Sequence, residues 1–328
     1  MAATVDHTLN KKSVQRKTLS NRGGKLPLVV IVGPTASGKS ATAMRIAEEF
    51  NGEIICADSR TIYKYMDIGT AKPSEEDKRQ IPHWGLDLVA PGESFTAADF
   101  KKYAVQKVHE IRQRGHLPMI VGGTGLYVDG VIFDYEFAPP QPELRKKLET
   151  VSTEELTKYC LNNNVILPEN PKNRRHLMSA IERKNISVKR LNEPIANTLV
   201  VGIATERDVL KQRITARAEQ LFETGMVEEA KKLGKKYGWD SEAMTGNIYR
   251  LTRRYLDGEF DEEELKQQFI ASDWKLAKRQ MTWLKRNRFI VWKPLDEAYS
   301  YLKERLSAAN KAESQIFPLP LQPELRWA

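Results

Sequence analysis

The chain has 328 residues, of which 41% are hydrophobic and 29% charged, and it carries a formal net charge of +9. This length suits one large domain or two modest ones, and the hydrophobic share suffices for a packed core. The excess of lysine and arginine over acidic residues favours a polyanionic partner. No apolar run reaches about 18 residues and the N-terminus lacks a secretory signal, so we expect neither a membrane-spanning helix nor export.

The chain begins with a polar, basic segment, residues 1–25, which we expect to be a disordered tail. An organelle transit peptide is the alternative, because such peptides share its arginine- and serine-rich composition. The ordered part of the chain is predicted to begin at Leu26.

The first predicted strand and helix enclose a phosphate-binding loop. The apolar run at residues 28–32 is followed by Gly-Pro-Thr-Ala-Ser-Gly-Lys-Ser at 33–40, and residues 40–50 have helical spacing. This matches the G-x-x-x-x-G-K-[ST] loop, in which backbone N–H groups and a helix N-terminus bind phosphate oxygens. We expect Lys39 to bind the terminal phosphates and the Ser40 hydroxyl to bind a magnesium ion. The predicted phosphate ligands are Gly33, Thr35, Ala36, Ser37, Gly38, Lys39 and Ser40.

Two further strands place polar residues at the same edge of the predicted sheet. Residues 53–58 end in Asp58, residues 99–115 have helical spacing, and the apolar run at 117–121 precedes Gly-Gly-Thr-Gly. Apolar strands that alternate with helices indicate a parallel sheet covered on both faces, with ligands at the carboxyl ends of the strands. Asp58 is there a candidate general base or water-mediated magnesium ligand, although a turn cap is an equally ordinary role. Thr124 is a candidate ligand of a phosphate or nucleophile, or a helix N-cap.

The strand at residues 117–121 lacks a carboxylate at its end. P-loop enzymes that hydrolyse ATP usually hold magnesium with such a carboxylate. Its absence favours a reaction in which the loop binds a diphosphate leaving group.

The middle and the end of the chain differ in pattern. Prolines at 139, 140 and 142 mark a boundary, and residues 138–195 are predicted to form a helical insertion. Strand pattern returns at 198–203, a long helix follows at 208–225, helices continue to residue 287, and a short strand is predicted at 289–292. We therefore predict an α/β fold: a P-loop NTPase-like parallel sheet covered by helices, formed by residues 26–137 and 196–306, with a helical insertion domain and a flexible tail at 307–328.

Residues 274–293 carry seven lysines and arginines, three tryptophans and no acidic residue. Basic residues at helical spacing can neutralise phosphates, and aromatic rings can stack on unpaired bases. A solvated basic helix whose tryptophans lie in the core is the alternative. No histidine or cysteine cluster has the spacing of metal ligands, His83 is predicted to be structural, and the two cysteines, Cys56 and Cys160, fit a reducing, cytoplasmic protein.

These segments together resemble the bacterial tRNA dimethylallyltransferase (isopentenyltransferase) family, from about residue 28 to about residue 292. The resemblance rests on the loop at 33–40, Asp-Ser-Arg-Thr-Ile-Tyr at 58–63, Gly-Gly-Thr-Gly-Leu-Tyr at 122–127 and Lys-Arg-Gln-Met-Thr-Trp-Leu at 278–284. The most specific string is Asp-Ile-Gly-Thr-Ala-Lys-Pro at 67–73, which ordinary P-loop kinases do not carry.

The resemblance implies transfer of a dimethylallyl group from dimethylallyl diphosphate to N6 of the adenosine immediately 3′ of the anticodon in tRNA. It implies that Lys39 and Ser40, with Mg²⁺, stabilise the departing diphosphate, that Asp58 accepts a proton from the adenine amine, and that Thr124 contacts a substrate. The attacked base must leave its stack, and the insertion would grip the tRNA. The residues assigned by resemblance to tRNA contact are Asp58, Ser59, Arg60, Thr61, Thr124, Arg145, Arg174, Arg175, Tyr249, Lys278, Arg279, Gln280, Trp283 and Lys285. We expect a monomer.

The sequence departs from the family pattern in two segments that the resemblance places against tRNA. The family usually has Asp and two arginines where this chain has Asn173, His176 and Ser179, and Arg174 and Arg175 are candidates to replace them in a shifted register. At residues 247–249 the family's Ile-Gly-Tyr is Asn-Ile-Tyr. These changes bear on substrate choice and RNA affinity rather than on the chemistry.

Two other enzymatic functions are weighed against this one. An isopentenyltransferase acting on free adenylate shares the phosphate loop but does not need the basic, tryptophan-rich segment. A small-molecule kinase or nucleotide switch predicts a magnesium carboxylate at a strand end, which the run at 117–121 does not supply. A protein that only binds RNA would leave Lys39 and Asp58 without a role.

Overall fold

The computed structural model describes residues 26–139, 141–184 and 189–311. The chain divides into two compact units, one formed by Met1–Ile132 and Pro194–Ala328 and the other by Phe133–Glu193. The second unit overlaps the segment 138–195, which the sequence predicts to be a helical insertion.

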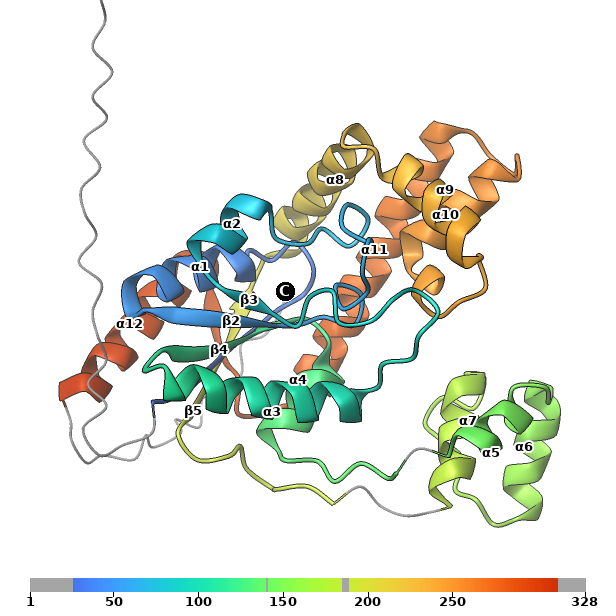
Figure 1. Ribbon diagram of the computed structural model, residues 1–328, viewed down its shortest axis with the longest axis horizontal. Helices are drawn as coiled ribbons and strands as arrows, with labels where there is room; N and C mark the ends of the chain where they lie inside the picture. Colours follow the sequence, from blue (N-terminus) through green and yellow to red (C-terminus); the bar gives the residue numbers. More distant parts are fainter. Residues whose placement is uncertain (1–25, 140, 185–188, 312–328) are drawn as a thin grey trace, which may run out of the picture. The chain divides into compact units, whose positions relative to one another are not determined.

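A six-stranded parallel sheet forms the centre of the first unit, in the order β3-β2-β4-β1-β5-β6 (Figure 1). In the middle of the sheet, Val30 pairs with Ile120 on one side and Val200 on the other, and all residues of β1 are fully buried. A strand covered on both faces must be apolar throughout, which explains the continuous Leu-Val-Val-Ile-Val run. The strands are β1 (Leu28–Val32), β2 (Gly52–Ala57), β3 (His83–Trp84), β4 (Leu117–Gly122), β5 (Thr198–Ala204) and β6 (Val291–Pro294).

Helices cover both faces of this sheet. α1 (Lys39–Phe50) and α12 (Leu295–Lys311) lie on one face, and α3 (Ala97–Gln113) and α4 (Gly125–Ile132) lie on the other (Figure 1). Ala298, Leu302 and Leu306 recur every four residues on one side of α12 and are fully buried in the cluster that includes α1 and the sheet.

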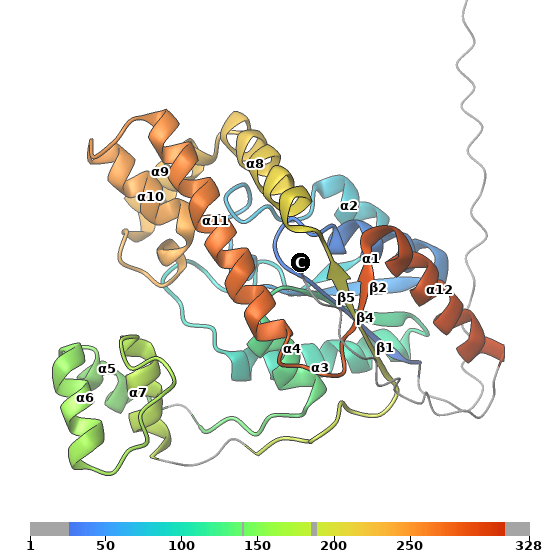
Figure 2. The ribbon, with the colours of Figure 1, turned by 180° about the vertical axis from the view of Figure 1, so that it is seen from behind.

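The helices between β5 and β6 gather beyond the carboxyl ends of the strands. They are α8 (Arg207–Glu223), α9 (Met226–Tyr237), the short 3₁₀ helix η1 (Ala243–Thr245), α10 (Asn247–Leu256) and α11 (Glu262–Leu284). The short α2 (Glu75–Gln80) lies in the segment between β2 and β3. The long α11 packs against α8 and α10 and reaches α4 (Figure 2). The fully or almost fully buried side chains of Met226, Ile248, Tyr249 and Phe269 form part of their shared core.

The second unit consists of α5 (Pro142–Leu148), α6 (Thr153–Asn162) and α7 (Arg174–Arg183). Its small core contains Leu156, Cys160, Leu177 and Ile181. The spacing of four residues within each of these pairs places them on one helix face, so that α6 and α7 pack through a single stripe.

The structure adds elements that the sequence pattern does not reveal. α2 and β3 lie in the polar stretch after residue 58, and β3 has only two residues, too few to show a period. α12 extends to Lys311, past residue 306, where the predicted core ends; residues 1–25 and 312–328 lie outside the described part of the chain. No helix in the described ranges is both long enough and apolar enough to cross a membrane.

A buried carboxylate ties β2 to its neighbours at the end of the sheet opposite Asp58. The side chain of Glu53 is 3% exposed and accepts hydrogen bonds from Arg114 at 2.7 and 2.9 Å and from Trp84 Nε1 at 2.6 Å, and His116 Nδ1 lies 2.6 Å away. Burial alone opposes ionisation of Glu53, but these hydrogen bonds outweigh it and hold its pKa below the ordinary value.

Replacing this carboxylate should destabilise the protein in a pH-dependent way. Glu53→Gln should lower the free energy of unfolding by about 2–4 kcal/mol at neutral pH, because Arg114, Trp84 and His116 lose a charged acceptor that is itself buried. Since the folded-state pKa lies below the unfolded value, the stabilisation exists above the unfolded pKa and disappears as the pH falls through the folded pKa. Denaturant titrations from neutral to acidic pH should therefore show the variant and wild type converging. Glu75→Gln, at a side chain that is 79% exposed, is the control and should change stability by less than about 0.5 kcal/mol.

Candidate active site

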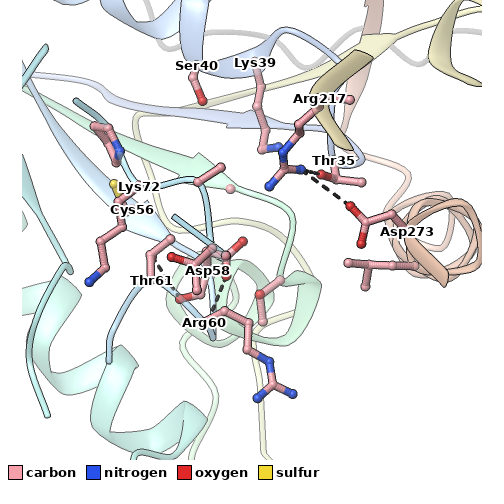
Figure 3. Close-up of a pocket in the computed structure, with 18 of the residues that line it drawn as sticks. Thr35, Lys39, Ser40, Cys56, Asp58, Arg60, Thr61, Lys72, Arg217 and Asp273 are labelled. Carbon is pink, nitrogen blue, oxygen red and sulfur yellow. Dashed lines mark hydrogen bonds and ion pairs between the residues drawn. The ribbon is translucent and has the colours of Figure 1, made fainter. Parts of the chain in front are cut away.

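A cavity of about 900 Å³ opens at the carboxyl ends of β1, β2 and β4 (Figure 3). Val32, Gly122 and Ala57 are lateral neighbours in the sheet, so the loops that follow these strands begin side by side. The predicted site residues that line this cavity are Thr35, Ala36, Gly38, Lys39, Ser40, Asp58, Ser59, Arg60, Thr61, Thr124, Tyr249, Arg279 and Gln280.

The phosphate loop between β1 and α1 turns through two left-handed residues, Ala36 with φ 60° and Gly38 with φ 91°. Gly33 and Ser37 are not among the cavity-lining residues and support the loop from within. A Cβ on Gly33 would lie 2.6 Å from the Ser37 hydroxyl oxygen, so a larger residue at this position would force that hydroxyl to move. This hydroxyl is buried and has no hydrogen-bond partner among the described residues, an arrangement that proteins seldom leave uncompensated.

Lys39 is the first residue of α1, and its Nζ donates to the Pro34 carbonyl at 3.2 Å. Burial lowers the pKa of Lys39 to about 8; the charge of Asp58 opposes this shift and that of Arg217 adds to it. An anion that binds beside Nζ favours the charged ammonium form, so this lysine is suited to holding phosphate oxygens.

α8 brings two arginines to the phosphate loop that the sequence analysis did not select. Arg217 Nη1 donates to the Thr35 hydroxyl, and Arg213 Nη1 donates to the Ser37 carbonyl at 3.3 Å. The two arginines are one helical turn apart, and both line the cavity with Lys39. Their spacing on α8 is visible in the sequence, but no local signal connects that helix with a loop far earlier in the chain.

α11 supports the same loop from another side. The Thr35 N–H donates to Gln280 Oε1 at 2.8 Å, so this residue, predicted as a tRNA contact, holds the phosphate loop in place. Asp273 Oδ2 lies 3.9 Å from Arg217 Nη1, and Asn247 Nδ2 lies 3.4 Å from Asp273 Oδ1. Burial raises the pKa of Asp273, and the arginine opposes that rise. Asp273 is thus, after Arg213 and Arg217, a third site residue that sequence reasoning missed.

Asp58 and Thr124 follow neighbouring strands and share one hydrogen-bonded turn. Asp58 Oδ1 accepts the Arg60 N–H at 2.8 Å, and Thr124 Oγ1 accepts the Ser59 N–H at 3.1 Å. The hydroxyl of Thr61, a residue only 7% exposed, reaches the Asp58 carbonyl at 3.5 Å. Within the described residues no hydrogen bond reaches Asp58 Oδ2, which leaves this oxygen able to accept a proton from a bound molecule.

Two residues predicted to contact tRNA are engaged within the protein. Arg60 Nη1 donates to the Glu242 carbonyl at 2.9 Å and so ties the turn after β2 to η1. Tyr249 is 1% exposed, and its hydroxyl donates to Glu229 Oε1 at 2.8 Å. Burial and the adjacent carboxylate raise the pKa of Tyr249. Both side chains therefore shape the cavity wall.

The basic segment of α11 divides into an outer and an inner set. Lys278, Arg279 and Lys285 are exposed, and of these Arg279 also lines the cavity. Trp283 Nε1 instead donates to the largely buried Asp129 at 2.7 Å and joins α11 to α4. In this structure Trp283 is a packing residue, whereas the exposed cations retain the character expected of an RNA-binding face.

The three other predicted tRNA contacts, Arg145, Arg174 and Arg175, lie in the second unit. Arg145 Nη2 donates to Glu182 Oε2 at 2.8 Å. Arg174 Nη2 donates to the Leu148 carbonyl at 3.2 Å, where it binds the C-terminal end of α5, and Arg175 is exposed. Arg174 thus has a structural partner, and Arg175 is the most accessible of the three.

The described residues include no group of three or more His, Cys, Asp or Glu side chains that could hold a metal ion. Oxygen donors are nevertheless present at the cavity: Ser40, an exposed residue, lies in the first turn of α1, and Asp58 directly follows β2 (Figure 3). Mg²⁺ commonly binds through one or two protein oxygens together with substrate phosphates and water. The donor set therefore fits a magnesium ion that is held mainly by a bound diphosphate.

Comparison with known proteins decides the family. A family model described as IPP transferase matches residues 61–287, more than half of the chain. The chain belongs to the IPP transferase family. Among its relatives, the tRNA dimethylallyltransferase of Acetivibrio thermocellus is 40% identical over 291 residues, covering 82% of this chain and 92% of the relative. The tRNA dimethylallyltransferase of Bacillus subtilis is 33% identical over 284 residues, covering 82% and 90%.

Solved structures confirm the fold predicted for this IPP transferase. The full-length tRNA isopentenylpyrophosphate transferase from Bacillus halodurans matches with a TM-score of 0.67 at 33% identity, covering 88% of this chain and 99% of that one. A eukaryotic dimethylallyltransferase acting on tRNA matches with a TM-score of 0.71 at 20% identity, a likeness that concerns the fold. The predicted P-loop-like parallel sheet and the family resemblance are thus both confirmed.

Proposed function

We propose that this IPP transferase moves a dimethylallyl group from dimethylallyl diphosphate to N6 of the adenosine 3′ of the anticodon in tRNA and releases diphosphate. The observation that carries the proposal is the meeting, in one cavity, of a phosphate loop surrounded by three cationic side chains and a carboxylate with an unengaged oxygen. The names of the curated relatives, tRNA dimethylallyltransferase, support the same assignment.

The cationic end of the cavity suits dimethylallyl diphosphate, the donor of the allyl group. Lys39, Arg213 and Arg217 face the phosphate loop and would stabilise the negative charge that builds on the diphosphate as the bond from the allylic carbon to oxygen breaks. A magnesium ion held by the diphosphate and the Ser40 hydroxyl would supply further positive charge. β4 ends without a carboxylate, which favours the diphosphate as a leaving group over phosphoryl transfer.

The end of the cavity that contains Asp58 suits the adenine that accepts the dimethylallyl group. We assign residues 58–61 and Thr124 to the adenine pocket, where the N6 lone pair attacks the allylic carbon as the diphosphate leaves with the electrons of the C–O bond. Asp58 Oδ2 then takes the proton that N6 loses, so that charge and atoms balance. An adenine that reacts inside a cavity must leave its stack in the RNA, as base-modifying enzymes require.

RNA contact is assigned to the exposed cations. Lys278 and Arg279 of α11, Lys285 directly after it and Arg175 of the second unit are exposed and suited to phosphate contact. Positioning roles are favoured for the buried or partly buried side chains that hold other parts of the protein, which are Arg60, Arg145, Arg174, Tyr249, Gln280 and Trp283. We retain the second unit as the part that grips tRNA, and the free Cys56 and Cys160 fit a cytoplasmic location.

A direct assay tests the proposed function. The purified protein is incubated with Mg²⁺ and radiolabelled dimethylallyl diphosphate, and tRNA, AMP and ATP are offered in parallel. Label should appear in tRNA at the adenosine next to the anticodon and be absent from the free nucleotides. Label in AMP or ATP alone would assign the free-nucleotide reaction, and transfer of a γ-phosphoryl group without use of the allylic donor would overturn the proposal.

Removing one exposed cation should weaken RNA binding in a salt-dependent manner. Arg279→Ala should raise the Kd for tRNA and reduce the slope of log Kd against log salt by about one, because one phosphate contact is lost. Filter binding at several salt concentrations measures that slope. Lys266→Ala, at a side chain paired with Glu262 at 3.2 Å on the same helix, is the charge-matched control. An unchanged slope for Arg279→Ala would remove this residue from the RNA-binding face.

A further inference from the structure

The loop at residues 67–69 is held by a single side chain from a distant helix. Glu229 of α9 accepts the N–H groups of three consecutive residues: Oε2 from Asp67 at 2.8 Å and from Ile68 at 2.7 Å, and Oε1 from Gly69 at 2.9 Å. Successive backbone N–H groups that converge in this way form an anion site, and here the anion is part of the protein. The Glu229 carboxylate therefore joins α9 to the loop at residues 67–69, which lies between β2 and α2.

Tyr249 completes this clamp from α10. Its hydroxyl donates to Glu229 Oε1 at 2.8 Å, so the carboxylate accepts four hydrogen bonds in all. The tyrosine ring also lies so close to Gly69 that a Cβ there would be 2.7 Å from the hydroxyl oxygen and 2.9 Å from Cζ. The glycine is thus required by close approach, and the loop has little freedom to move toward α10.

The clamped loop leads directly into the cavity wall. Gly69, Thr70, Ala71, Lys72 and Pro73 all line the cavity. The opposite side of this segment is held as well, since Lys72 Nζ donates to the Tyr63 carbonyl at 2.7 Å and to Asp87 at 2.6 Å. Its side chain is 2% exposed, so this cation is committed to the loop rather than to a ligand.

We propose that Glu229 is a positioning residue for the proposed transfer reaction, and that it acts by fixing the loop at 67–73 in the conformation that binds substrates. The inference rests on the proposed function only for its kinetic readout. Without the clamp the loop samples other conformations, and the fraction of protein ready to bind falls, which raises the apparent Kd or KM by the inverse of that fraction. Saturating substrates restore the loop, so kcat is kept.

The test compares Glu229→Gln with Glu228→Gln, its exposed neighbour on the same turn of α9. A glutamine at 229 offers one acceptor oxygen where the carboxylate offers two, and its NH₂ group faces N–H donors. Hydrogen exchange of a peptide spanning residues 66–73, measured without substrates, should be faster by about tenfold or more in Glu229→Gln and unchanged in Glu228→Gln. Tyr249→Phe, which removes one of the four hydrogen bonds, should give a smaller increase.

Steady-state kinetics with dimethylallyl diphosphate and tRNA then separate positioning from general damage. Glu229→Gln should raise KM for at least one substrate by about tenfold with kcat within about twofold of wild type. A fall in kcat at unchanged KM would mean only that less protein is folded, and would overturn the proposal, as would unchanged exchange of the 66–73 peptide. Should wild type transfer no dimethylallyl group, the proposed function fails while the exchange experiment still decides whether the clamp orders the loop.

Discussion

Lys39→Ala should lower kcat/KM for dimethylallyl diphosphate by about 10³-fold or more, because the side chain supplies charge where the diphosphate develops its own. The lysine begins α1, and its Nζ lies against the phosphate loop, 3.2 Å from the Pro34 carbonyl. Initial rates at varied donor concentration measure the loss. Lys102→Ala, which removes an exposed cation from α3, is the control and should retain the wild-type rate. Turnover near that of wild type in Lys39→Ala would show that the loop does not bind the donor.

The pH dependence follows from the pKa of about 8 that burial imposes on Lys39. Below this pH the ammonium form predominates, and above it the neutral amine cannot attract the diphosphate, so kcat/KM for the donor should fall as the pH rises through about 8. Lys39→Arg should show no such break, because a guanidinium group does not titrate in this range. Since the folded-state pKa lies below the unfolded value of 10.5, the buried charge costs stability below about pH 8, and this cost diminishes between about pH 8 and 10.5. Lys39→Met should therefore raise the Tm at neutral pH while abolishing activity.

Asp58→Asn should slow the chemical step by about 10²–10⁴-fold, the usual contribution of a positioned general base. Asparagine keeps an oxygen that can accept the Arg60 N–H, now at 2.8 Å from Oδ1, so the turn after β2 is retained and only the capacity to take a proton is lost. Single-turnover rates with both substrates saturating report this step without contributions from binding.

The pair Asp58→Asn and Asp58→Ala distinguishes chemistry from structure. The Kd for tRNA should stay within about threefold of wild type in Asp58→Asn, whereas Asp58→Ala also loses the turn and should weaken binding. A loss of only a few-fold in the single-turnover rate of Asp58→Asn would reduce this residue to a positioning role, and the proton would need another acceptor.

Local patterns in the sequence predicted the parts of the site that lie at strand ends. The loop at 33–40, Asp58 and Thr124 each follow an apolar run, and the parallel register brings those ends together. Arg213 and Arg217 could not be predicted in this way, because their spacing on α8 is that of any exposed helix and only tertiary packing directs them to the phosphate loop. The same holds for Glu229, whose partners lie about 160 residues earlier in the chain.

Composition was a weaker guide than strand ends in the basic segment of α11. The tryptophan content favoured RNA contact for Trp283, and the family resemblance implied it for Gln280, yet Trp283 donates to Asp129 and Gln280 accepts from the Thr35 N–H. A helix that packs on one side and faces solvent on the other mixes both kinds of residue at intervals of three and four, and the sequence does not say which side is which. The sequence pattern also failed to predict β3 and α12. Short or terminal elements depend for their stability on packing partners elsewhere in the chain, so their own residues carry little local signal.

The hydrogen bond from Thr35 to Gln280 spans 245 positions of the chain. A nascent polypeptide on the ribosome therefore exposes its anion-binding turn long before the segment that braces it has been synthesised. A chain that ends before α11 cannot form the complete cavity, even when its first strands and helices have already left the ribosome. The ability to modify RNA should consequently arise late during synthesis, once α11 has been made and has packed against the phosphate loop.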